Sequence, residues 1–301
     1  MLRESGPLVS VVCTCYNHAP FIARALQGFV DQRLNGAIEV IVHDDASTDG
    51  SADIIRDFEA RYPKVIKAIY QAENQYKLEK GRVTRIVHGA ARGKYIAVCE
   101  GDDYWTDPLK LQKQVDLLEA HPDVAICFHR AHTLKDGVQE LFPIPDDVDP
   151  TDFRFDDLLR RYNFVNTATT MFRRAILPMP SWNKRSPFGD LVLYMHAGTH
   201  GRMVMLPESM AVWRISGQGA WTSLDKEKQD RNMLRFYRVA RTYLSPGQKG
   251  LLDRKRRMIL DGEATARYPA DPRLKRVLYE ALWLRETWYD LIERWRSFGQ
   301  A

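Results

Sequence analysis

The sequence predicts an α/β protein with a mostly parallel sheet flanked by helices and a helical extension at its C-terminus. Short β-branched runs alternate with segments of helical periodicity along the first part of the chain. Three of these runs end in hydroxyl and carboxylate side chains, in the stretches "TCYN", "HDDAS" and "CEGDD". Because ligands bind outside the carboxyl ends of parallel strands, the three stretches are expected to meet at one site.

The expected elements follow one another regularly. Strands are predicted in "PLVSVVCTCYN", "IEVIVHDD", "VIKAIYQAEN" and "KYIAVCEGDD". Helices are predicted in "HAPFIARALQGFVDQ", "SADIIRDFEARYP", "IVHGAARG" and "DPLKLQKQVDLLEAHPD". Further along, "NFVNTATTMFRRAIL" is expected to be a threonine-rich strand and "DLVLYMHAG" an apolar helix. This alternation favours helices on both faces of the sheet.

Bulk composition narrows the class of protein. The 301 residues are 45% hydrophobic and 28% charged, which is ordinary for a globular protein. No apolar run approaches the length that crosses a bilayer, and the first 17 residues lack the layout of a signal peptide, so a cytoplasmic location is expected. The four cysteines include no CxxC spacing, which speaks against a zinc site or a redox pair.

Charge divides the chain into two predicted domains, residues 1–225 and 226–301. The second carries 18 Lys and Arg against 10 Asp and Glu, a net of +8, whereas the whole chain carries +5. Its helical stripe is expected to pack against the first domain or to form a homodimer interface. The alternative is peripheral contact with an anionic membrane surface. No recognised motif supports nucleic-acid binding.

The acidic stretch after the fourth strand is the strongest candidate for a metal site. Asp102 and Asp103 are adjacent, and a turn after Gly101 would let both approach one centre. Mg²⁺ or Mn²⁺ is often held by one or two carboxylates together with substrate phosphates. The alternative is that Asp102 caps the next helix, for which Asp107 is better placed.

Asp44 and Asp45 directly follow the second strand, where a carboxylate can reach a nucleotide ribose or base, or can simply form a turn. No GxGxxG follows the first strand, and the chain contains neither a P-loop nor a GxSxG motif. These absences exclude the common dinucleotide, nucleoside-triphosphate and hydrolase fingerprints.

In combination, "VSVVCTCYNHAPFIARALQGFVDQ", "VIVHDDASTDGS" and "AARGKYIAVCEGDDYWTDPLKLQKQV" resemble a family 2 glycosyltransferase with the GT-A fold, over about residues 7–225. The resemblance implies Asp102 and Asp103 as metal ligands for Mn²⁺ or Mg²⁺, with Glu100 where many relatives carry Asp. It also implies nucleotide contacts from Thr14, Tyr16, Asn17, Asp44, Asp45 and one basic residue among Lys80, Arg82 and Arg85, of which Arg82 is preferred.

The same resemblance implies a catalytic base at the start of a helix in the second half of the domain. Asp190 follows Gly189 at the start of the expected helix, so it is the predicted base; the alternative is that it only caps that helix, and the two roles are compatible. Asp156, Asp157 and Glu208 lack this context. Additional phosphate or acceptor contacts are expected from Arg214, Trp105 and Thr167.

The segment after Arg214 resembles the part of the family that closes over the donor phosphates. Many relatives carry His two residues after the Arg, whereas this chain has Ser216, so no third protein metal ligand is expected there. Gly217 and Gly219 are expected to make this segment a mobile lid.

The resemblance implies an inverting glycosyltransferase of the hexosyltransferase type. Its donor would be a nucleotide-diphosphate sugar, with uridine the family's usual nucleotide, and its acceptor a glycan or a lipid-linked hydroxyl in polysaccharide biosynthesis. Two alternatives are a sugar nucleotidyltransferase, whose Gly-rich basic loop is missing from "TCYNHAP", and a non-catalytic nucleotide- or carbohydrate-binding protein. The expected location is cytoplasmic, including the inner face of the membrane.

Overall fold

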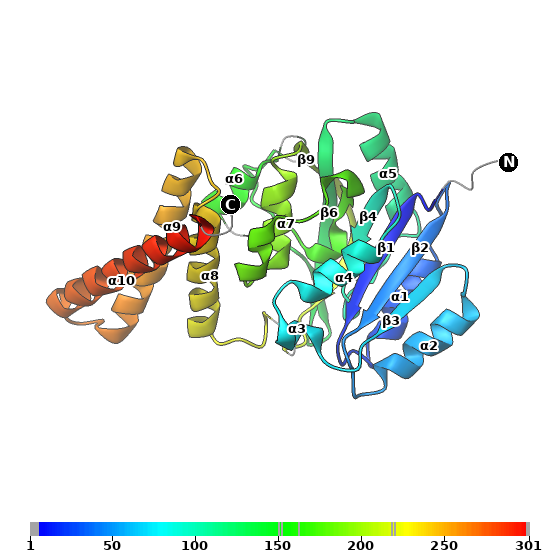
Figure 1. Cartoon of the computed structure of the whole chain (residues 1–301), viewed down its shortest axis with the longest axis horizontal. Coiled ribbons are helices and arrows are strands. Elements are labelled where there is room, and N and C mark those ends of the chain that lie inside the picture. Colours follow the sequence, from blue (N-terminus) through cyan, green and yellow to red (C-terminus); the bar gives the residue numbers. More distant parts are fainter. Residues whose placement is uncertain are drawn as a thin grey trace.

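A single nine-stranded sheet organises the computed structural model, which describes residues 6–149, 151, 153–161, 163–217, 219 and 221–298, the side chains at 294 and 296–298 excepted. The strand order is β3-β2-β1-β4-β8-β6-β9-β5, and β7 pairs with β6 (Figure 1). The strands are β1 Val9–Cys15, β2 Ile38–Asp44, β3 Ile66–Tyr70, β4 Tyr95–Val98, β5 Tyr104–Trp105, β6 Val124–Lys135, β7 Val138–Leu141, β8 Met171–Arg173 and β9 Arg202–Arg214.

The predicted α/β architecture is confirmed, and the sheet has two halves of different character. β3, β2, β1 and β4 are parallel neighbours, as the strand–helix alternation predicts. β8 then runs antiparallel to both β4 and β6, and β5 runs antiparallel to β9, whereas β6 and β9 are parallel. The polar ends of β1 and β4 therefore lie together at one edge, beside the antiparallel half.

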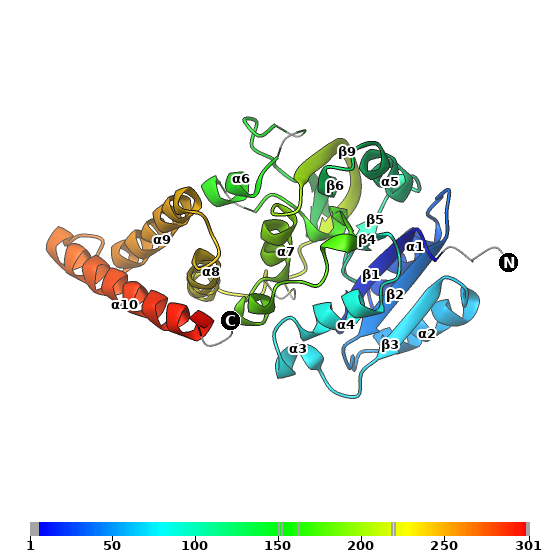
Figure 2. The same ribbon diagram turned by 45° about the horizontal axis from the view of Figure 1, so that its top comes forward.

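Helices cover both faces of the sheet and bury two cores. Val9, Val11 and Cys13 of β1 pack with α1, α2 and α5 on one face, whereas Val12 points into the other core with α4, α6 and α7 (Figure 2). This alternation along one strand is the period of two that a sheet buried on both faces requires. These helices are α1 Ile22–Val30, α2 Ser51–Arg61, α3 Gln75–Leu78, α4 Arg82–Ala90, α5 Lys110–Ala120, α6 Phe155–Arg160 and α7 Gly189–Ala197.

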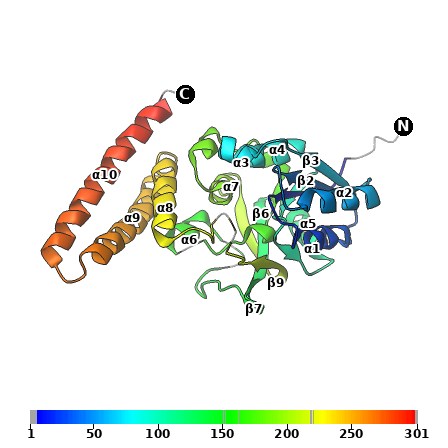
Figure 3. The same cartoon turned by 90° about the horizontal axis from the view of Figure 1, so that it is seen from below.

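The C-terminal region is helical, as expected, and consists of α8 Lys226–Arg241, α9 Pro246–Arg267 and α10 Pro272–Phe298. α8 lies next to the sheet domain, and α10 is the outermost helix of the molecule (Figure 3). Leu234, Leu260 and Leu282, one from each helix, form a small core of their own. Among the described residues, no helix combines the length and apolarity needed to cross a membrane.

One local expectation was wrong. The segment 163–177 is mostly not a strand, because the Asn166 side chain accepts a hydrogen bond from the Ala168 N–H and caps a 3-10 turn over Thr167–Thr169. Only three residues, Met171–Arg173, continue as β8. In addition, the polar segment after β3 holds the short helix α3, which Asn74 caps through the N–H of Lys77.

Candidate active site

A cavity of about 730 Å³ lies at the carboxyl ends of β1 and β4. Thr14 and Glu100 form its floor at the sheet edge, and the start of α7 forms one side. Lys80 and Thr84 line it from the α3–α4 segment, and α8 covers it with Phe236. Predicted site residues that line this cavity are Thr14, Asp102, Asp103, Thr167, Asp190 and Arg214.

Glu100, Asp102 and Asp103 form an acidic wall, held by a tight turn. The Gly101 N–H donates to the Thr14 carbonyl at 2.9 Å, and the Asp103 N–H donates to the Glu100 carbonyl at 3.1 Å. A Cβ at position 101 would lie 2.7 Å from Ile22 Cδ1, so only glycine lets the turn approach α1 this closely. All three carboxyl groups consequently border the cavity, as the sequence predicts.

Burial and mutual repulsion disfavour the charged forms of Glu100 and Asp103 in the acidic wall. Burial, followed by repulsion from Asp102, raises the pKa of Glu100 to about 8. Burial and the charges of Asp102 and Glu100 also raise the pKa of Asp103 well above its usual range. A cation placed against this wall would stabilise all three carboxylates, so the electrostatics favour binding of a positively charged group.

Arg214 braces the acidic wall from the end of β9. Its N–H donates to Asp103 Oδ1 at 2.8 Å, and its Nη1 donates to the Asp102 carbonyl at 2.7 Å. The guanidinium lies over the ring of Tyr104 at 4.5 Å and over that of Phe21 at 5.0 Å. Arg214 therefore fixes Asp103 through its backbone while its half-buried side chain stays at the cavity.

The donor set suits a cation held mainly by Asp102. One oxygen of Asp103 already accepts from Arg214, whereas the ion-pair partner of Asp102 Oδ2 among the described residues is His18, whose Nε2 lies 3.9 Å away. Among the residues that the structure describes, no group of three His, Cys, Asp or Glu side chains converges on one point. A hard cation that keeps its remaining positions for phosphate oxygens fits such a sparse carboxylate site.

Asp190 faces the cavity from the first turn of α7. Burial raises its pKa, whereas hydrogen bonds from the backbone of Leu191 and Asp190 and from Asn163 lower it. The Asn163 Nδ2 donates to Asp190 Oδ2 at 3.2 Å. The N-cap position of α7 is Phe188, so Asp190 stands in the first turn and not at the N-cap. It borders the cavity, where a bound molecule could meet its carboxylate.

Asp45, a predicted nucleoside ligand, is occupied by the protein itself. Its two oxygens accept hydrogen bonds from the N–H groups of Gln75 at 2.6 Å and Tyr76 at 3.1 Å, so it caps α3. This places Tyr76 and Lys80 on the cavity wall, with Lys80 Nζ 3.7 Å from the centre of the Tyr76 ring. Asp45 thus shapes the site through α3.

The other residues expected at the nucleoside lie beside the cavity. Asp44 is buried and accepts from the Ser47 N–H, while its second oxygen has no hydrogen-bond partner among the described residues. Asn17 accepts from the Thr48 N–H at 2.8 Å and ties this turn to the end of β1. Tyr16 is 39% exposed, with Lys77 Nζ 6.0 Å from its ring centre.

Among the three basic candidates, the structure brings only Lys80 to the cavity. Arg82 opens α4 and is absent from the described residues that line the cavity. Arg85 forms a two-pronged ion pair with Glu79 at 2.7 and 3.1 Å. The location therefore favours Lys80 over Arg82 as the basic residue at the nucleotide. Gly81 lies between them in the left-handed conformation and turns the chain there.

Trp105 does not reach the cavity. It is 5% exposed, its Nε1 donates to the Ala168 carbonyl at 2.8 Å, and its ring packs edge-on against Phe29. Lys110 Nζ lies 3.8 Å from the centre of the same ring. Trp105 consequently belongs to the core behind the acidic wall, and the expectation of a phosphate or acceptor contact does not hold for it.

Sequence reasoning missed the contribution of α8. Asn232, Met233, Arg235 and Phe236 line the same cavity as Asp190, although they lie beyond the predicted boundary at residue 225. The amphipathic pattern of α8 could have suggested a packed helix, but nothing in it indicated a site. The predicted lid segment after Arg214 contributes Gly219 to the cavity, and its residues 218 and 220 lie outside the described part of the chain.

Comparisons with known proteins agree with this geometry. The family model for glycosyl transferase family 2 matches residues 10–177. The uncharacterized protein Rv1520 of Mycobacterium tuberculosis is 39% identical over 224 residues, covering 71% of this chain and 61% of that protein. The putative glycosyltransferase EpsE of Bacillus subtilis is 38% identical over 120 residues, covering 39% of this chain and 41% of EpsE.

Solved structures share the fold. S. aureus TarS 1–349 in complex with UDP has a TM-score of 0.57 at 16% identity, covering 97% of this chain and 91% of that one. The mannosyltransferase PcManGT from Pyrobaculum calidifontis, in complex with GDP-Man and Mn²⁺, has a TM-score of 0.56 at 17% identity, covering 98% and 88%. The shared architecture is the GT-A fold expected from the sequence. The family match extends over more than half of the chain, and the chain therefore belongs to glycosyl transferase family 2.

Proposed function

We propose that this glycosyltransferase moves a hexosyl group from a nucleotide-diphosphate sugar to an acceptor hydroxyl, with inversion at the anomeric carbon. The observation that carries the proposal is the shared cavity: the Asp190 carboxylate and the acidic wall of Glu100, Asp102 and Asp103 border the same space. One carboxylate can then receive a proton while the opposite wall, with a cation, meets the departing diphosphate. The family match favours this reaction over a nucleotidyl transfer or a purely binding role.

Asp190 acts on the acceptor. Its carboxylate takes the proton of the acceptor hydroxyl as that oxygen bonds to the anomeric carbon, and the bond from that carbon to the diphosphate breaks. Asn163 holds one carboxylate oxygen through the 3.2 Å hydrogen bond, which leaves the other to face the acceptor. A single base opposite the leaving group gives inversion.

The leaving group would be stabilised at the acidic wall. Bound at Asp102, Mn²⁺ or Mg²⁺ would neutralise charge on the diphosphate. Lys80 and Arg214 supply two further positive charges on the cavity wall. Thr14, at the end of β1, supports nucleotide binding at the sheet edge, and Asp45 contributes by holding α3 in place.

Uridine is the proposed base of the donor. TarS structures contain UDP and UDP-GlcNAc, whereas PcManGT contains GDP-Man, so both nucleotides occur in proteins of this fold. For the acceptor we propose a glycan or lipid-linked hydroxyl in surface-polysaccharide assembly at the inner face of the membrane. The apolar side chains of Phe155, Leu158, Met233 and Phe236 also line the cavity, and they support an acceptor with an apolar part.

The chain spans about three fifths of the length of the mycobacterial relatives that it matches, at 61%. Residues 1–225 are proposed to carry donor binding and residues 226–301 to complete the acceptor side through α8. Because Asn232 and Phe236 belong to the cavity wall, removing the second region would open the site.

The test pairs Asp190→Asn with Glu208→Gln. Asp190→Asn removes the base while leaving the shape of the cavity, so transfer should fall by about 10²–10⁴-fold with donor affinity unchanged. Glu208 is exposed on β9 and makes the same carboxylate-to-amide change outside the cavity, so its activity should stay normal. Transfer is followed by nucleoside diphosphate release, and the anomer of the product is read by NMR. Near-normal turnover of Asp190→Asn, or a retained anomer, would overturn the mechanism.

A further inference from the structure

An apolar stripe runs along the outer face of α10. Val277, Ala281, Leu284, Trp288, Leu291 and Trp295 recur at alternating intervals of four and three residues, which places them on one side of a helix. Here these six residues are called the outer stripe. Leu284 is 68% exposed, Trp288 64% and Trp295 79%, whereas Leu282 on the opposite side is 5% exposed. The helix therefore has a second apolar face besides the one that packs on the protein.

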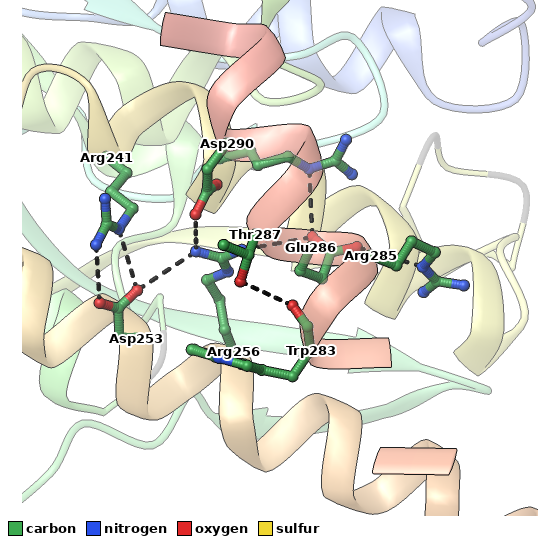
Figure 4. A network of polar contacts seen from close by, with 9 residues as sticks. Arg241, Asp253, Arg256, Trp283, Arg285, Glu286, Thr287 and Asp290 are labelled. Atoms are coloured by element: carbon green, nitrogen blue, oxygen red, sulfur yellow. Dashed lines mark hydrogen bonds and ion pairs between the residues drawn. The ribbon is translucent and has the colours of Figure 1, made fainter. Parts of the chain in front are cut away.

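Three of the four acidic residues of α10, Glu286, Asp290 and Glu293, point inward. Glu286 is 1% exposed and lies 3.3 Å from Arg238 Nε of α8, while Asp290 Oδ2 lies 2.7 Å from Arg256 Nη1 of α9. Glu293 pairs with Arg185 at 3.1 Å. Figure 4 shows the centre of this network, with Arg256 between acidic side chains of α9 and α10.

This inward pairing leaves the outer face of α10 basic. Arg273, Arg276 and Arg285 are exposed and flank the outer stripe on its two sides, and Glu280 is the one exposed acidic residue on the described part of the helix. Arg285 Nε lies 3.7 Å from Glu286 Oε1, and Glu286 also forms an ion pair with Arg238. An apolar surface bordered by cations is thus presented outward.

We propose that the outer stripe binds the surface of an anionic lipid bilayer, with α10 lying parallel to the membrane plane. Two exposed tryptophans and four aliphatic side chains suit the boundary between headgroups and acyl chains, where tryptophan is enriched. Arginines beside them can extend to lipid phosphates while their stems stay in apolar surroundings. Because α10 is the outermost helix, it reaches a flat surface before the sheet domain does (Figure 3).

Charge decides between a bilayer and a second copy of the chain. Apolar residues at alternating spacings of three and four also favour helix pairing. Pairing two outer stripes would bring Arg273, Arg276 and Arg285 of both copies together, with Glu280 as the one exposed acid to compensate them on each. An anionic bilayer neutralises all of these charges at once. The observations therefore favour lipid.

Flotation of the 301-residue chain with vesicles tests this inference without any turnover, so it stands or falls independently of the transfer reaction. The vesicles contain either phosphatidylcholine alone or a mixture with phosphatidylglycerol. The chain should float with the anionic vesicles, and added salt should weaken the binding. Each exposed arginine near an anionic surface is worth about fivefold in binding, so Arg276→Gln with Arg285→Gln should lose roughly 25-fold.

Matched variants separate the outer stripe from general effects. Trp288→Ser with Trp295→Ser should lose at least about tenfold in binding, since both rings leave the interface. Arg33→Gln with Lys64→Gln removes the same charge from exposed sites near the other end of the molecule and should leave binding unchanged. Circular dichroism and urea unfolding verify that each variant is folded.

Three outcomes would overturn the proposal: no flotation with anionic vesicles, equal loss in the α10 and control variants, or a dimer in solution that the tryptophan double variant dissociates. The last outcome would assign the outer stripe to a second copy of the chain. Sedimentation equilibrium of the same proteins measures it.

Discussion

Asn163→Ala is the most informative perturbation of the site, because Asn163 contacts Asp190, the proposed base, through one hydrogen bond. Its Nδ2 donates to Asp190 Oδ2 at 3.2 Å, and this bond stabilises the charged form of Asp190 against the burial that raises its pKa. Removing the amide leaves burial less opposed, so the pKa of Asp190 rises further. A hydrogen bond to a charged group contributes about 1.5–3 kcal/mol, and the length of this one favours the lower end.

The corresponding shift in the pKa of Asp190 is about one unit upward. As a general base, Asp190 acts when deprotonated, so kcat/KM rises with pH up to its pKa and then levels off. The variant should lose roughly tenfold in kcat/KM at a pH below both pKa values and match the wild type on the plateau. Glu100 titrates in the same cavity, with a pKa of about 8. Its contribution to the pH profile should be the same in the wild type and in Asn163→Ala, so it does not produce the difference between the two curves.

The assay is the pH profile of kcat/KM, followed by release of nucleoside diphosphate. Asn232→Ala removes an amide from the same cavity wall and serves as the control, since its acid limb should coincide with that of the wild type. If the limb of Asn163→Ala also coincides, or if its activity falls by the same factor at every pH, Asp190 is not the base that the geometry indicates.

Three further predictions concern the cation, a buried lysine and the C-terminal helices. Asp102→Asn should weaken Mn²⁺-dependent donor binding at least about tenfold in calorimetry, because Asp102 is the carboxylate left for a cation; equal affinities would exclude that role. Burial lowers the pKa of Lys110 to about 7 from 10.5, so the unfolded state holds more protons between these values and stability rises with pH there, by about 1.4 kcal/mol per unit. Lys110→Met should lack this slope in urea unfolding, whereas Lys113→Met, at a lysine whose pKa is raised, should keep it; two parallel curves for the wild type and Lys110→Met would contradict the reasoning. Arg256→Gln removes the cation that pairs with buried carboxylates, so it should lower the free energy of unfolding by roughly 3–5 kcal/mol, measured by urea unfolding. A loss below about 1 kcal/mol would show that these carboxylates do not depend on Arg256.

The strands and their polar ends were predictable from the sequence because burial on both faces leaves a clear apolar run. β1 and β2 are rich in buried valine, isoleucine and cysteine, and strongly polar stretches follow each of them in the sequence. The turn at Gly101 was predictable as well. Adjacent residues of an extended strand point to opposite sides, so two adjacent aspartates can border one cavity only if the strand ends before them. These features depend on neighbours in the sequence.

Contacts between distant segments could not be predicted in this way. Asp45 follows a strand just as a nucleoside ligand would, but its oxygens meet the N–H groups of Gln75 and Tyr76, thirty residues further along. Trp105 lies next to the acidic wall in sequence, yet its indole finds the Ala168 carbonyl in the core. Only the folded arrangement decides which of several chemically suitable partners a side chain takes.

The backbone conformation at Thr167 was not predicted either, in this case because of a local contact. A run of threonines favours a strand by propensity, whereas the Asn166 side chain satisfies the local backbone and produces a turn instead. The residue still reaches the cavity, but from a different backbone conformation than the sequence indicates.

The position of α8 across the cavity has a consequence for how such enzymes diversify. The residues proposed to meet the leaving group come from the sheet domain, whereas Asn232, Met233 and Phe236 come from a helix that follows it in the sequence. If α8 forms the acceptor side as proposed, replacing its cavity-lining residues would change the recipient molecule while the residues proposed to meet the donor stay the same.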